Sequence, residues 1–507
     1  MRGERPDKSL GAVVMAAGLG KRMKSKLAKV LHPVAGRPMV LYAVDLAQQL
    51  AGEHVAVVVG YQGKEVRAAI EASGPRQPVM IVEQTQQLGT GHAVQQARDV
   101  FRRLGKSLST YVILNGDTPL LKPATLQALL RLHQEERAAV TVLTATPGNP
   151  AGYGRVVRAK GGRVQKIVED RDATDAEKQI GEINVGTYVT DGAFLFTALD
   201  RLRPRNVQGE YYLTDVVALA VERGLRVSAL TVRRAAEGMG INSREQLATA
   251  ERVIRRRTCA HWMREGVTLR NPATTSIDAD VVIGRDTVIH PDVTLEGRTT
   301  IGEDCIIRSH TRISDSALGH RVVVQDHCVV REARLEDDAS IGPFAHLRPG
   351  AVLRRAAKVG NFVEMKKAEL GEGSKANHLS YLGDAKIGKG VNIGAGTITC
   401  NYDGHKKYDT VIGDDVFIGS DTQLVAPVTI GKGAVIAAGA TITADVPPDT
   451  LAIARVQQVN RPGWASRQRA LQTGGSLPPS RKLTSMKADK VSGKSSGRDV
   501  KPAKRRL

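Results

Sequence analysis

The chain contains few aromatic residues and few cysteines. Aromatic side chains make up 4% of its 507 residues, whereas glycine occurs 51 times. This pairing indicates a region built from small and β-branched residues rather than from large aromatic anchors. The four cysteines are far apart and form no C-x-x-C pair (Cys259, Cys305, Cys328, Cys400). The spacing therefore argues against a disulfide framework or a cysteine zinc site, and a reducing compartment is expected.

The sequence also has no apolar run of the roughly 20 residues that a bilayer-spanning helix needs. The first 20 residues could be read as a signal peptide, because Arg2, Arg5 and Lys8 precede "LGAVVMAAGLG". That apolar run is short, however, and the glycines and basic residues after it fit a phosphate-binding loop better. We therefore predict no membrane insertion.

The positive charge is unevenly distributed. Of 73 basic residues twelve lie in 467–507, where only two of the 52 acidic residues are found. This tail has little to bury, so residues 466–507 are predicted to be basic and disordered. It has no aromatic residue on which bases could stack, which argues against a nucleic-acid-binding protein as the main function. Non-specific, salt-dependent contact with polyanions is compatible with it.

Two patterns divide the rest of the chain. From residue 9 to about 240, β-branched runs such as "GAVVMAA", "HVAVVVG", "PVMIVEQ", "TYVILNGD" and "AVTVLTAT" alternate with longer segments of mixed polarity. This alternation predicts a Rossmann-like α/β domain whose mostly parallel sheet is covered on both faces. Ligands bind such sheets at the carboxyl ends of the strands. Residues 243–266 are then expected to form one long helix that links two domains.

From about residue 280 the aliphatic residues recur every sixth position. The two clearest series are Ile283, Ile289, Leu295, Ile301, Ile307, Ile313 and Ile412, Ile418, Leu424, Ile430, Ile436, Ile442. A period of six fits neither a helix nor an ordinary strand, and it predicts a left-handed parallel β-helix of hexapeptide repeats. We expect interruptions of the repeat, as loops, near 365–385 and at 400–410. Polar residues concentrate there: Glu364, Lys366, Lys367, Asn377, His378, Tyr381, Asn401 and Tyr402.

A glycine turn follows the first predicted strand. In "AVVMAAGLGKRM" the third glycine of a dinucleotide-binding G-x-G-x-x-G is replaced by Met23, and no G-K-[S/T] of a Walker A loop follows. A glycine turn at the start of a helix offers N–H groups to an anion, and Lys21, Arg22 and Lys29 add positive charge. The stretch predicts binding of several phosphates, with a plain strand–turn–helix as the alternative.

Two further stretches support a nucleotide site. "ILNGDTPL" ends a predicted strand with Asp117, where a carboxylate can hold Mg²⁺ against a triphosphate. Alternatively, Asp117 is a turn aspartate that accepts hydrogen bonds from local amides. "QLGTGHA" supplies a second glycine turn, in which Gly89 and Thr90 can contact a base or its phosphates together with Gln84.

These motifs resemble a known family. "AAGLGKRM…K" followed by "GD" is similar to nucleotide-sugar pyrophosphorylases, and "QLGTGHA", "GYGRVV", "IVEDRDAT", "EINVG" and "QGEYYLTD" narrow the resemblance. The second half agrees through "IGPFAHLRPG", "GNFVEMKKAELGEGSKANHLSYLGDA", "VNIGAGTITCNYDG" and "DDVFIGSDTQLVAPVTIG". Over about residues 10–465 the chain resembles the bifunctional N-acetylglucosamine-1-phosphate uridylyltransferase / glucosamine-1-phosphate N-acetyltransferase family.

The resemblance implies two activities and four segments. The enzyme would acetylate glucosamine 1-phosphate with acetyl-CoA and then transfer UMP from UTP to N-acetylglucosamine 1-phosphate, giving UDP-N-acetylglucosamine and pyrophosphate. The segments are a uridylyltransferase domain (1–240), a linker helix (241–268), an acetyltransferase β-helix (269–465) and the tail (466–507). A homotrimer is implied, as is a cytoplasmic role in supplying cell-envelope precursors.

The resemblance also assigns residues to the first site. Arg22 and Lys29 would act on the phosphates, and Asp117 with Asn242 would hold Mg²⁺. The nucleotide and nucleotide-sugar contacts would come from Ala16, Ala17, Gly18, Lys29, Gln84, Gly89, Thr90, Gly154, Glu169, Asn184 and Asn242. The chain departs from the usual family pattern at Lys21, Ala28 and Asn115.

In the second half, His378 is implied as the base that removes a proton from the attacking amine, with Glu364 as its orienting partner. Glucosamine 1-phosphate would contact Arg348, Lys366, Tyr381 and Asn392, because a dianionic phosphate favours charge-assisted contacts. Acetyl-CoA would contact Ala395, Asn401, Tyr402, Ser420, Ala438 and Arg455. Asn377 departs from the glycine common in relatives.

Two other interpretations concern the β-helix. It could serve only for oligomerisation or regulation of a pyrophosphorylase, although the polar residues at 364–402 argue against this. It could also bind a metal through histidines, for which His310, His320, His327, His346, His378 and His405 are available. No H-x₄-H pair with regular coil spacing supports such a metal site.

Overall fold

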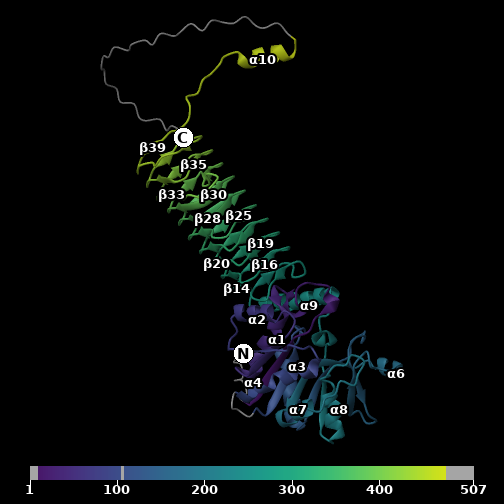
Figure 1. The fold of residues 1–507 in the computed structure, drawn as a ribbon. Coiled ribbons are helices and arrows are strands. Elements are labelled where there is room, and N and C mark those ends of the chain that lie inside the picture. The colour runs from purple at the N-terminus through teal and green to yellow at the C-terminus, as the bar shows by residue number, and fades with distance from the viewer. Residues whose placement is uncertain (1–8, 104–107, 475–507) are drawn as a thin grey trace, which may run out of the picture. The chain divides into compact units, whose positions relative to one another are not determined.

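The computed structural model describes residues 9–103 and 108–474. Residues 10–231 form an α/β domain around a sheet with the strand order β11-β7-β10-β6-β1-β4-β5 (Figure 1). Its strands are β1 (Leu10–Ala16), β4 (Val55–Val59), β5 (Met80–Glu83), β6 (Thr110–Asn115), β7 (Val140–Ala145), β10 (Ile183–Asp191) and β11 (Val227–Thr231). Among these seven strands only β10 runs antiparallel to its neighbours, so the prediction of a mostly parallel sheet is confirmed. The hairpin β8 (Arg155–Arg158) and β9 (Val164–Val168) extends from β10.

Helices cover both faces of this sheet. Successive residues of a strand point to opposite faces, so the continuous apolar strands place hydrophobic side chains on both. Ala12 and Val14 belong to one buried cluster and Val13 to another. Helices α1 (Met39–Ala51), α2 (Gly63–Ala72) and α5 (Pro123–Glu135) pack into the first cluster. Helices α3 (Thr90–Gln96), α4 (Arg98–Arg103), α7 (Gly192–Leu199) and α8 (Asp215–Glu222) pack into the second. The short helix α6 (Asp175–Lys178) follows β9 and has no buried residue.

The glycine turn after β1 does not lead into an α-helix, contrary to expectation. It is followed by η1 (Lys21–Met23), a single 3-10 turn bounded by Gly20 and Lys24, both in the left-handed region. A second 3-10 turn, η2 (Lys29–Leu31), comes next. A Cβ at Gly20 would lie 2.5 Å from the Cβ of Lys29, so glycine lets the two turns approach closely. Any phosphate here is bound without the dipole of a long helix.

The expected linker helix is present as α9 (Arg244–Arg264). Its N-terminus is stabilised by a capping box, in which Ser243 and Gln246 satisfy each other's backbone N–H groups. The 3-10 turn η3 (Ala235–Gly238) lies just before it, and the hairpin β2 (Pro33–Val34) and β3 (Arg37–Pro38) contacts it. In the part of the chain that the structure describes, no helix has the length and apolarity to cross a bilayer.

After α9 the chain forms stacked coils of short parallel strands, confirming the parallel β-helix (Figure 1). One sheet contains β12 (Thr268–Leu269), β15 (Val288–Ile289), β18 (Ile306–Ile307), β21 (Val323–Val324), β24 (Ser340–Ile341), β27 (Lys358–Asn361), β29 (Lys375–His378), β31 (Asn392–Ile393), β34 (Phe417–Ile418), β37 (Val435–Ile436) and β39 (Leu451–Ala452). The other strands form a 17-stranded sheet that folds around the coil. They are β13 (Ser276–Ile277), β14 (Val282–Ile283), β16 (Thr294–Glu296), β17 (Thr300–Ile301), β19 (Arg312–Ser314), β20 (Ala317–Leu318), β22 (Val329–Arg331), β23 (Arg334–Leu335), β25 (His346–Leu347), β26 (Val352–Leu353), β28 (Glu364–Leu370), β30 (Tyr381–Ile387), β32 (Ile398–Cys400), β33 (Thr410–Ile412), β35 (Gln423–Val425), β36 (Val428–Ile430) and β38 (Thr441–Ile442).

The aliphatic residues of both predicted series form the core of these coils. All twelve are at most 4% exposed, and they belong to one continuous cluster. Burial of each such side chain contributes about 1.5–3 kcal/mol. Because each coil contacts only its neighbours, stability accumulates along the stack.

The expected interruption near 365–385 is not a loop. Strands β28 and β30 continue the stack there, paired from Glu364–Tyr381 to Leu370–Ile387. Paired residues at these coils are 17 positions apart in the sequence, whereas Ile341 and Val359 are 18 apart. The coil that is shorter by one residue shifts the six-residue repeat. The second expected interruption is a loop, since Ile393 pairs with Ile418 and the extra residues include an isolated bridge between Tyr402 and Lys407.

The segment from Arg455 onward forms a separate unit. Contrary to the prediction of disorder from residue 466, its described part contains helix α10 (Trp464–Gln472). None of the helix residues is buried. The rest of the predicted tail, residues 475–507, lies outside the described residues.

Candidate active sites

Two adjoining cavities open at the carboxyl ends of β1 and β6. The larger has a volume of about 560 Å³ and the smaller about 170 Å³. Both are lined by Met15, Thr90, Asn115 and Asp117. A ligand with a nucleotide part and a second part on either side of Asp117 would fit this arrangement.

The predicted residues of the first site divide between the cavities. The larger is lined by Ala17, Gly18, Lys29, Gln84, Gly89 and Thr90, and the smaller by Gly154, Glu169, Asn184 and Asn242. Ala16 ends β1 as a buried residue and lines neither. The nucleotide and sugar sets predicted from the resemblance therefore lie in neighbouring halves of one depression.

Lys29 lies between the two predicted metal ligands. Its Nζ donates to Asp117 Oδ2 and to Asn242 Oδ1, the latter at 3.0 Å. The side chains of Lys29 and Asp117 are only 14% and 16% exposed. Two oxygen ligands thus already converge on one cationic group. Carboxylate and amide oxygens are also ligands that Mg²⁺ accepts, so these residues fit a magnesium ion.

Two further basic residues lie close to this centre. Lys21, one of the departures from the family pattern, lines the larger cavity. Arg22 lines neither cavity, but its Nη1 lies 3.6 Å from the position that a Cβ on Gly152 would occupy. Since Gly152 lines the smaller cavity, Arg22 approaches the shared region from that side. Ala28, the second departure, is buried and donates its N–H to Gln62 at 2.6 Å.

The larger cavity is shaped by Gln84 and Thr90. The Gln84 side chain is buried, and its amide donates to Gly89 O at 3.2 Å, which fixes the glycine turn. Thr90 accepts a hydrogen bond from the N–H of Leu213 at 3.0 Å. Both contacts hold the "QLGTGHA" turn against the rest of the domain.

The smaller cavity contains two hydrogen-bonded pairs. Asn184 Nδ2 donates to the hydroxyl of Tyr188 at 2.7 Å, and Thr214 donates to Glu169 Oε1 at 3.3 Å. Burial raises the pKa of Glu169, and the neighbouring carboxylates of Asp172 and Asp215 raise it further. Burial also raises the pKa of Tyr188, which keeps its hydroxyl protonated. The cavity can thus recognise hydroxyl and amide groups of a sugar.

Sequence reasoning missed several residues of this depression. Asn115, treated as a neutral departure, lines both cavities, and its amide donates to Val185 O at 3.4 Å. Arg171, Gln208 and Glu210 also line the larger cavity. Arg171 and Glu210 lie within the quoted stretches "IVEDRDAT" and "QGEYYLTD", so the signal was available but unassigned.

The predicted second site begins on one face of the β-helix. Arg348 Nη1 donates to Glu364 Oε1 at 2.7 Å. Among the described residues, Glu364 therefore has Arg348, not His378, as its hydrogen-bond partner, and its role in orienting His378 stays a prediction. The Glu364 carboxylate accepts this bond because Arg348 and Glu364 stand on the neighbouring coils of β25 and β28. The side chain of His378 is exposed and has no hydrogen-bond partner in the described part of the chain.

Positive charge converges on the same face. The pKa of Lys366 is lowered by the ammonium of Lys407 and, more weakly, by Arg348. Lys407 lies on the 400–410 loop and was not predicted. Like charges held close together favour an anion between them, so the arrangement is compatible with the predicted phosphate contact. A lysine in a loop without regular spacing gives no sequence signal of this kind.

Tyr381 and Asn401 lie beside this cationic group. A Cβ on Gly383 would lie within 2.4 Å of the Tyr381 hydroxyl and 2.8 Å of Asn401 Nδ2. Asn401 also donates to Asp384 Oδ2 at 2.5 Å. The hydroxyl of Tyr402 donates to Gly404 O within the loop at 2.6 Å. The predicted residues Arg348, Lys366, Tyr381 and Asn401 thus lie on one face of the β-helix. Asn392 lies on β31 in the other sheet, paired with Lys375.

Three of the predicted acetyl-CoA contacts, Ala395, Ser420 and Ala438, form a column at one corner of the coil. Asp421 N donates to Ala395 O at 2.7 Å, and Gly439 N donates to Ser420 O at 2.8 Å. The N–H of Gly396, the residue after Ala395, donates to Leu379, the residue after His378. The corner column therefore runs from His378 through Ala395 and Ser420 to Ala438. Arg455 belongs to the separate C-terminal unit.

Comparisons with known proteins agree with both halves. Residues 12–180 match the family described as MobA-like NTP transferase domain, and residues 280–315 and 409–444 match bacterial transferase hexapeptide repeats. The chain is therefore a transferase that joins a nucleotidyltransferase domain to a hexapeptide-repeat β-helix.

The full-length comparison narrows this class. The chain is 50% identical to the "Bifunctional protein GlmU" of Geotalea uraniireducens over 456 residues, which cover 90% of the chain and 98% of that protein. It is also 50% identical to the protein of the same name from Pelobacter propionicus, covering 91% and 99%. The chain belongs to the GlmU family of bifunctional proteins.

Proposed function

We propose that the chain acetylates glucosamine 1-phosphate with acetyl-CoA and then joins the product to UMP from UTP. The observation that carries the second reaction is the pair of cavities that meet at Asp117. The first reaction is supported by the cationic face at Lys366 and Lys407, close in the fold to the corner that carries His378. Family membership supports both assignments.

In uridylyl transfer, an oxygen of the sugar 1-phosphate attacks the α-phosphorus of UTP while the bond to the β-phosphate breaks and pyrophosphate leaves. The chain contributes positioning and charge rather than a nucleophile. Lys29, Lys21 and Arg22 compensate the phosphate charge, and Gly18 and Gly89 let the backbone approach. Asp117 and Asn242 would hold Mg²⁺, which when bound neutralises phosphate charge.

In acetyl transfer, His378 accepts the proton that the glucosamine amine loses as it attacks the thioester carbonyl. The carbon–sulfur bond then breaks, and His378 returns the proton to the sulfur, so that CoA leaves as the free thiol. Arg348, Lys366 and Tyr381 would hold the sugar phosphate. The small residues Ala395, Ser420 and Ala438 leave room for a long cofactor along the corner.

The direct test is a two-stage assay on the purified full-length chain with Mg²⁺. Glucosamine 1-phosphate and acetyl-CoA are supplied while free thiol is measured, and UTP is then added while pyrophosphate is measured. Thiol release followed by pyrophosphate release supports both activities and their order. Pyrophosphate release only from ready-made N-acetylglucosamine 1-phosphate would reduce the β-helix to a scaffold.

The raised pKa of Glu169 predicts pH dependence of sugar binding. Glu169 must be ionised to accept hydrogen bonds from the sugar, and burial together with Asp170, Asp172 and Asp215 raises its pKa above the ordinary value of 4.5. As pH falls through this raised pKa, the KM for N-acetylglucosamine 1-phosphate should rise by up to about tenfold per pH unit. Burial raises the pKa of Asp215 to about 6, so this second carboxyl also takes up a proton as the pH falls.

The Glu169→Gln variant separates these contributions. It should show a higher KM at pH 8 but a flatter dependence on pH than the wild type. Initial rates at varied sugar concentration between pH 5 and pH 8 measure both quantities. An unchanged slope in the variant would assign the dependence to Asp215 instead.

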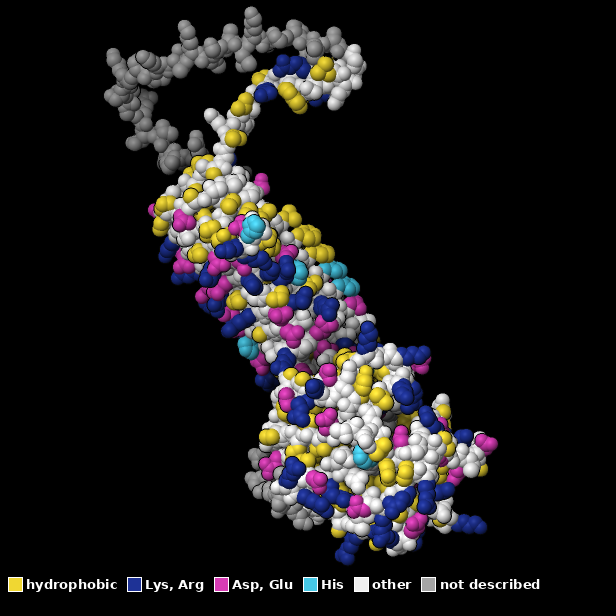
Figure 2. Space-filling view, viewed as in Figure 1, with side chains coloured by type: hydrophobic (Ala, Val, Ile, Leu, Met, Phe, Trp, Pro, Cys, Tyr) yellow, Lys and Arg dark blue, Asp and Glu magenta, His cyan; other side chains and the backbone are white. Residues whose placement is uncertain are grey.

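We propose further that the chain is a homotrimer whose subunits meet along one corner of the β-helix. At this corner the rings of His310, His327, Phe344 and Phe362 stack with centroid separations of 4.8, 4.8 and 5.2 Å. On the face shown in Figure 2, histidine side chains are followed by hydrophobic ones along the edge of the β-helix. The two phenylalanines are about half exposed, which is costly for large aromatic side chains without a partner.

The Phe362→Ser variant should weaken this assembly. Loss of one buried aromatic per subunit removes about 3 kcal/mol or more of contact energy. We expect light scattering after gel filtration to show smaller species and acetyl transfer to fall with them, whereas uridylyl transfer persists. Val282→Ser is a matched control, since Val282 is also about half exposed but lies on β14. An unchanged mass for Phe362→Ser would remove this corner from the interface.

We place the enzyme in the cytoplasm, where its nucleotide and CoA substrates are made, as a supplier of cell-envelope precursors. Non-specific contact of the basic tail with polyanions would be an accessory property. Deletion of residues 475–507 should weaken retention on heparin and leave both activities intact.

A further inference from the structure

The elements that carry the magnesium and phosphate residues share one small core with the linker helix. Each predicted residue lies a few positions from a member of this core: Lys29 from Val34, Asp117 from Leu120, and Asn242 from Ile241. The core consists of Val34, Ala35, Met39, Leu120, Ile241, Ala250 and Ile254. Ala250 and Ile254 belong to α9, and Ala279 from the first coils of the β-helix packs against it.

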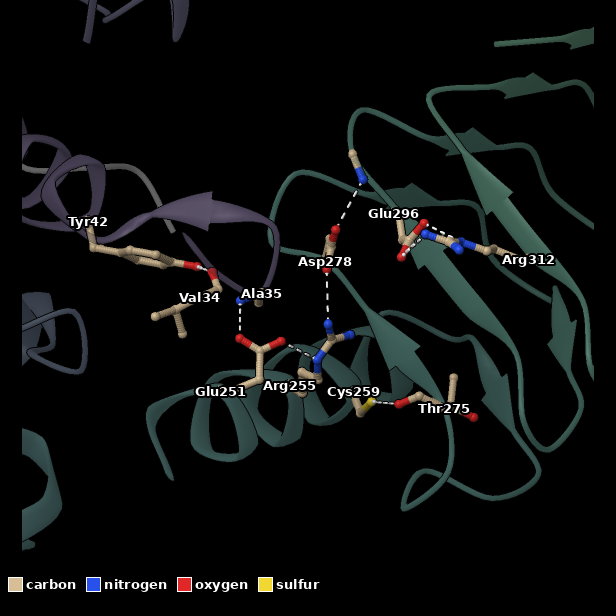
Figure 3. Close-up of polar contacts among 11 residues, drawn as sticks. Val34, Ala35, Tyr42, Glu251, Arg255, Cys259, Thr275, Asp278, Glu296 and Arg312 are labelled. Atoms are coloured by element: carbon tan, nitrogen blue, oxygen red, sulfur yellow. Dashed lines mark hydrogen bonds and ion pairs between the residues drawn. The ribbon is translucent and has the colours of Figure 1, made fainter. Parts of the chain in front are cut away.

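The hairpin that follows Lys29 is held on two sides at its tip. Ala35 N donates to Glu251 Oε2 of α9 at 2.5 Å (Figure 3), and Ala35 O accepts from the N–H of Ala279 at 3.0 Å. Tyr42 of α1 donates to Val34 O at 2.7 Å. The tip is therefore bonded to the linker helix and to the β-helix at the same time.

Asp278 extends this contact into the β-helix. Its Oδ1 accepts from Arg255 at 3.4 Å, and its Oδ2 accepts from Gly297 N of the next coil at 3.1 Å (Figure 3). Arg255 also donates from Nε to Glu251 Oε1 at 2.6 Å. Asp278 is 6% exposed, and a Cβ on Gly36 would lie 2.2 Å from its Oδ2. The hairpin turn thus lies directly against a buried, hydrogen-bonded carboxylate.

The other two active-site segments are also bonded to this region. Arg257 of α9 donates to Leu120 O at 2.8 Å, just beyond Asp117. Ile241 N donates to Asp117 O at 2.9 Å, and Asn242 immediately precedes the α9 capping box. Movement of α9 would therefore shift all three segments.

We propose that Glu251, Arg255 and Asp278 are positioning residues for uridylyl transfer, which makes the first coils of the β-helix part of the nucleotidyl-transfer machinery. The network fixes the hairpin tip at Ala35. Lys29 is joined to that tip by only a 3-10 turn and a two-residue strand, so fixing the tip places its ammonium between Asp117 and Asn242. The inference rests on the proposed uridylyl transfer.

The test uses the full-length Glu251→Ala variant, which removes the acceptor of the Ala35 N–H. We expect kcat for uridylyl transfer to fall about tenfold, because a small displacement of a positioning group is costly to rate. The KM for UTP should rise, and acetyl transfer should stay within about twofold of wild type. Glu251→Gln should restore most of the activity, because its amide oxygen still accepts from Ala35.

Glu296→Ala is the matched control. Glu296 forms an ion pair with Arg312 at 2.7 Å near the same coils (Figure 3), and neither partner bonds to the described α/β domain. Asp278→Asn, which keeps an acceptor for Gly297 but loses the charge, should lower uridylyl transfer in the same direction as Glu251→Ala.

Two outcomes would overturn the inference. One is uridylyl transfer in Glu251→Ala and Asp278→Asn that equals that of Glu296→Ala. The other is an equal fall in both activities together with a lowered melting temperature, which indicates a structural role only. A wild-type chain that releases no pyrophosphate refutes the proposed function itself, so the two failures are distinguishable.

Discussion

The Asp117→Ala variant should lose uridylyl transfer by about a thousandfold while acetyl transfer is retained. Removing the carboxylate takes away the charged side chain that would hold Mg²⁺, and loss of one preorganised electrostatic contact in an active site typically costs 10² to 10³ in kcat. It also leaves the Lys29 ammonium, now hydrogen-bonded to Asp117, without its anionic partner. Pyrophosphate release from UTP and N-acetylglucosamine 1-phosphate measures the effect.

The acetyl-transfer rate of the same preparation is the internal control, because Asp117 lies in the α/β domain and has no contact with the predicted acetyl site. Asp117→Asn keeps the shape of the side chain and separates charge from size. We expect it to be impaired nearly as strongly. Near-normal pyrophosphate release by the alanine variant would end the metal assignment.

The His378→Ala variant should show the opposite pattern. Acetyl transfer should fall about a thousandfold, since general-base catalysis typically contributes 10² to 10⁴. The side chain is exposed, so its removal opens no cavity in the β-helix core. Uridylyl transfer with supplied N-acetylglucosamine 1-phosphate should stay within about twofold.

Free-thiol release is the measurement, and His290→Ala is the matched control on a distant coil. Because Glu364 is bonded to Arg348, Glu364→Gln should raise the KM for glucosamine 1-phosphate more than it lowers kcat. Loss of both activities in His378→Ala would show that the histidine is structural.

The fold was largely predictable because its signals are long and regular. The sixfold series from Ile283 to Ile442 identified the β-helix core, since every coil must bury one aliphatic per face. The continuous apolar runs identified the central strands. The predicted helix after Gly20 was wrong because left-handed residues at Gly20 and Lys24 confine η1 to one turn, which residue identity alone does not reveal.

The candidate sites were predictable only in part. The resemblance named residues far apart in sequence, such as Gln84 and Glu169, that the fold brings to adjoining cavities. It did not name Lys407 or Tyr188, because their roles arise from contacts with Lys366 and Asn184. The hydrogen-bond partner of Glu364 could not be predicted either, because it depends on which residues stand opposite one another on neighbouring coils.

The corner column of the β-helix would set the length of a ligand bound along it. His378, Ala395, Ser420 and Ala438 stand on four successive coils, and neighbouring parallel strands are about 4.8 Å apart. Three strand spacings, or roughly 14 Å, therefore separate His378, the predicted base, from Ala438. Insertion of one coil between His378 and Ala438 would lengthen this distance by one strand spacing, so a ligand bound along the column would then have to be longer by the same amount.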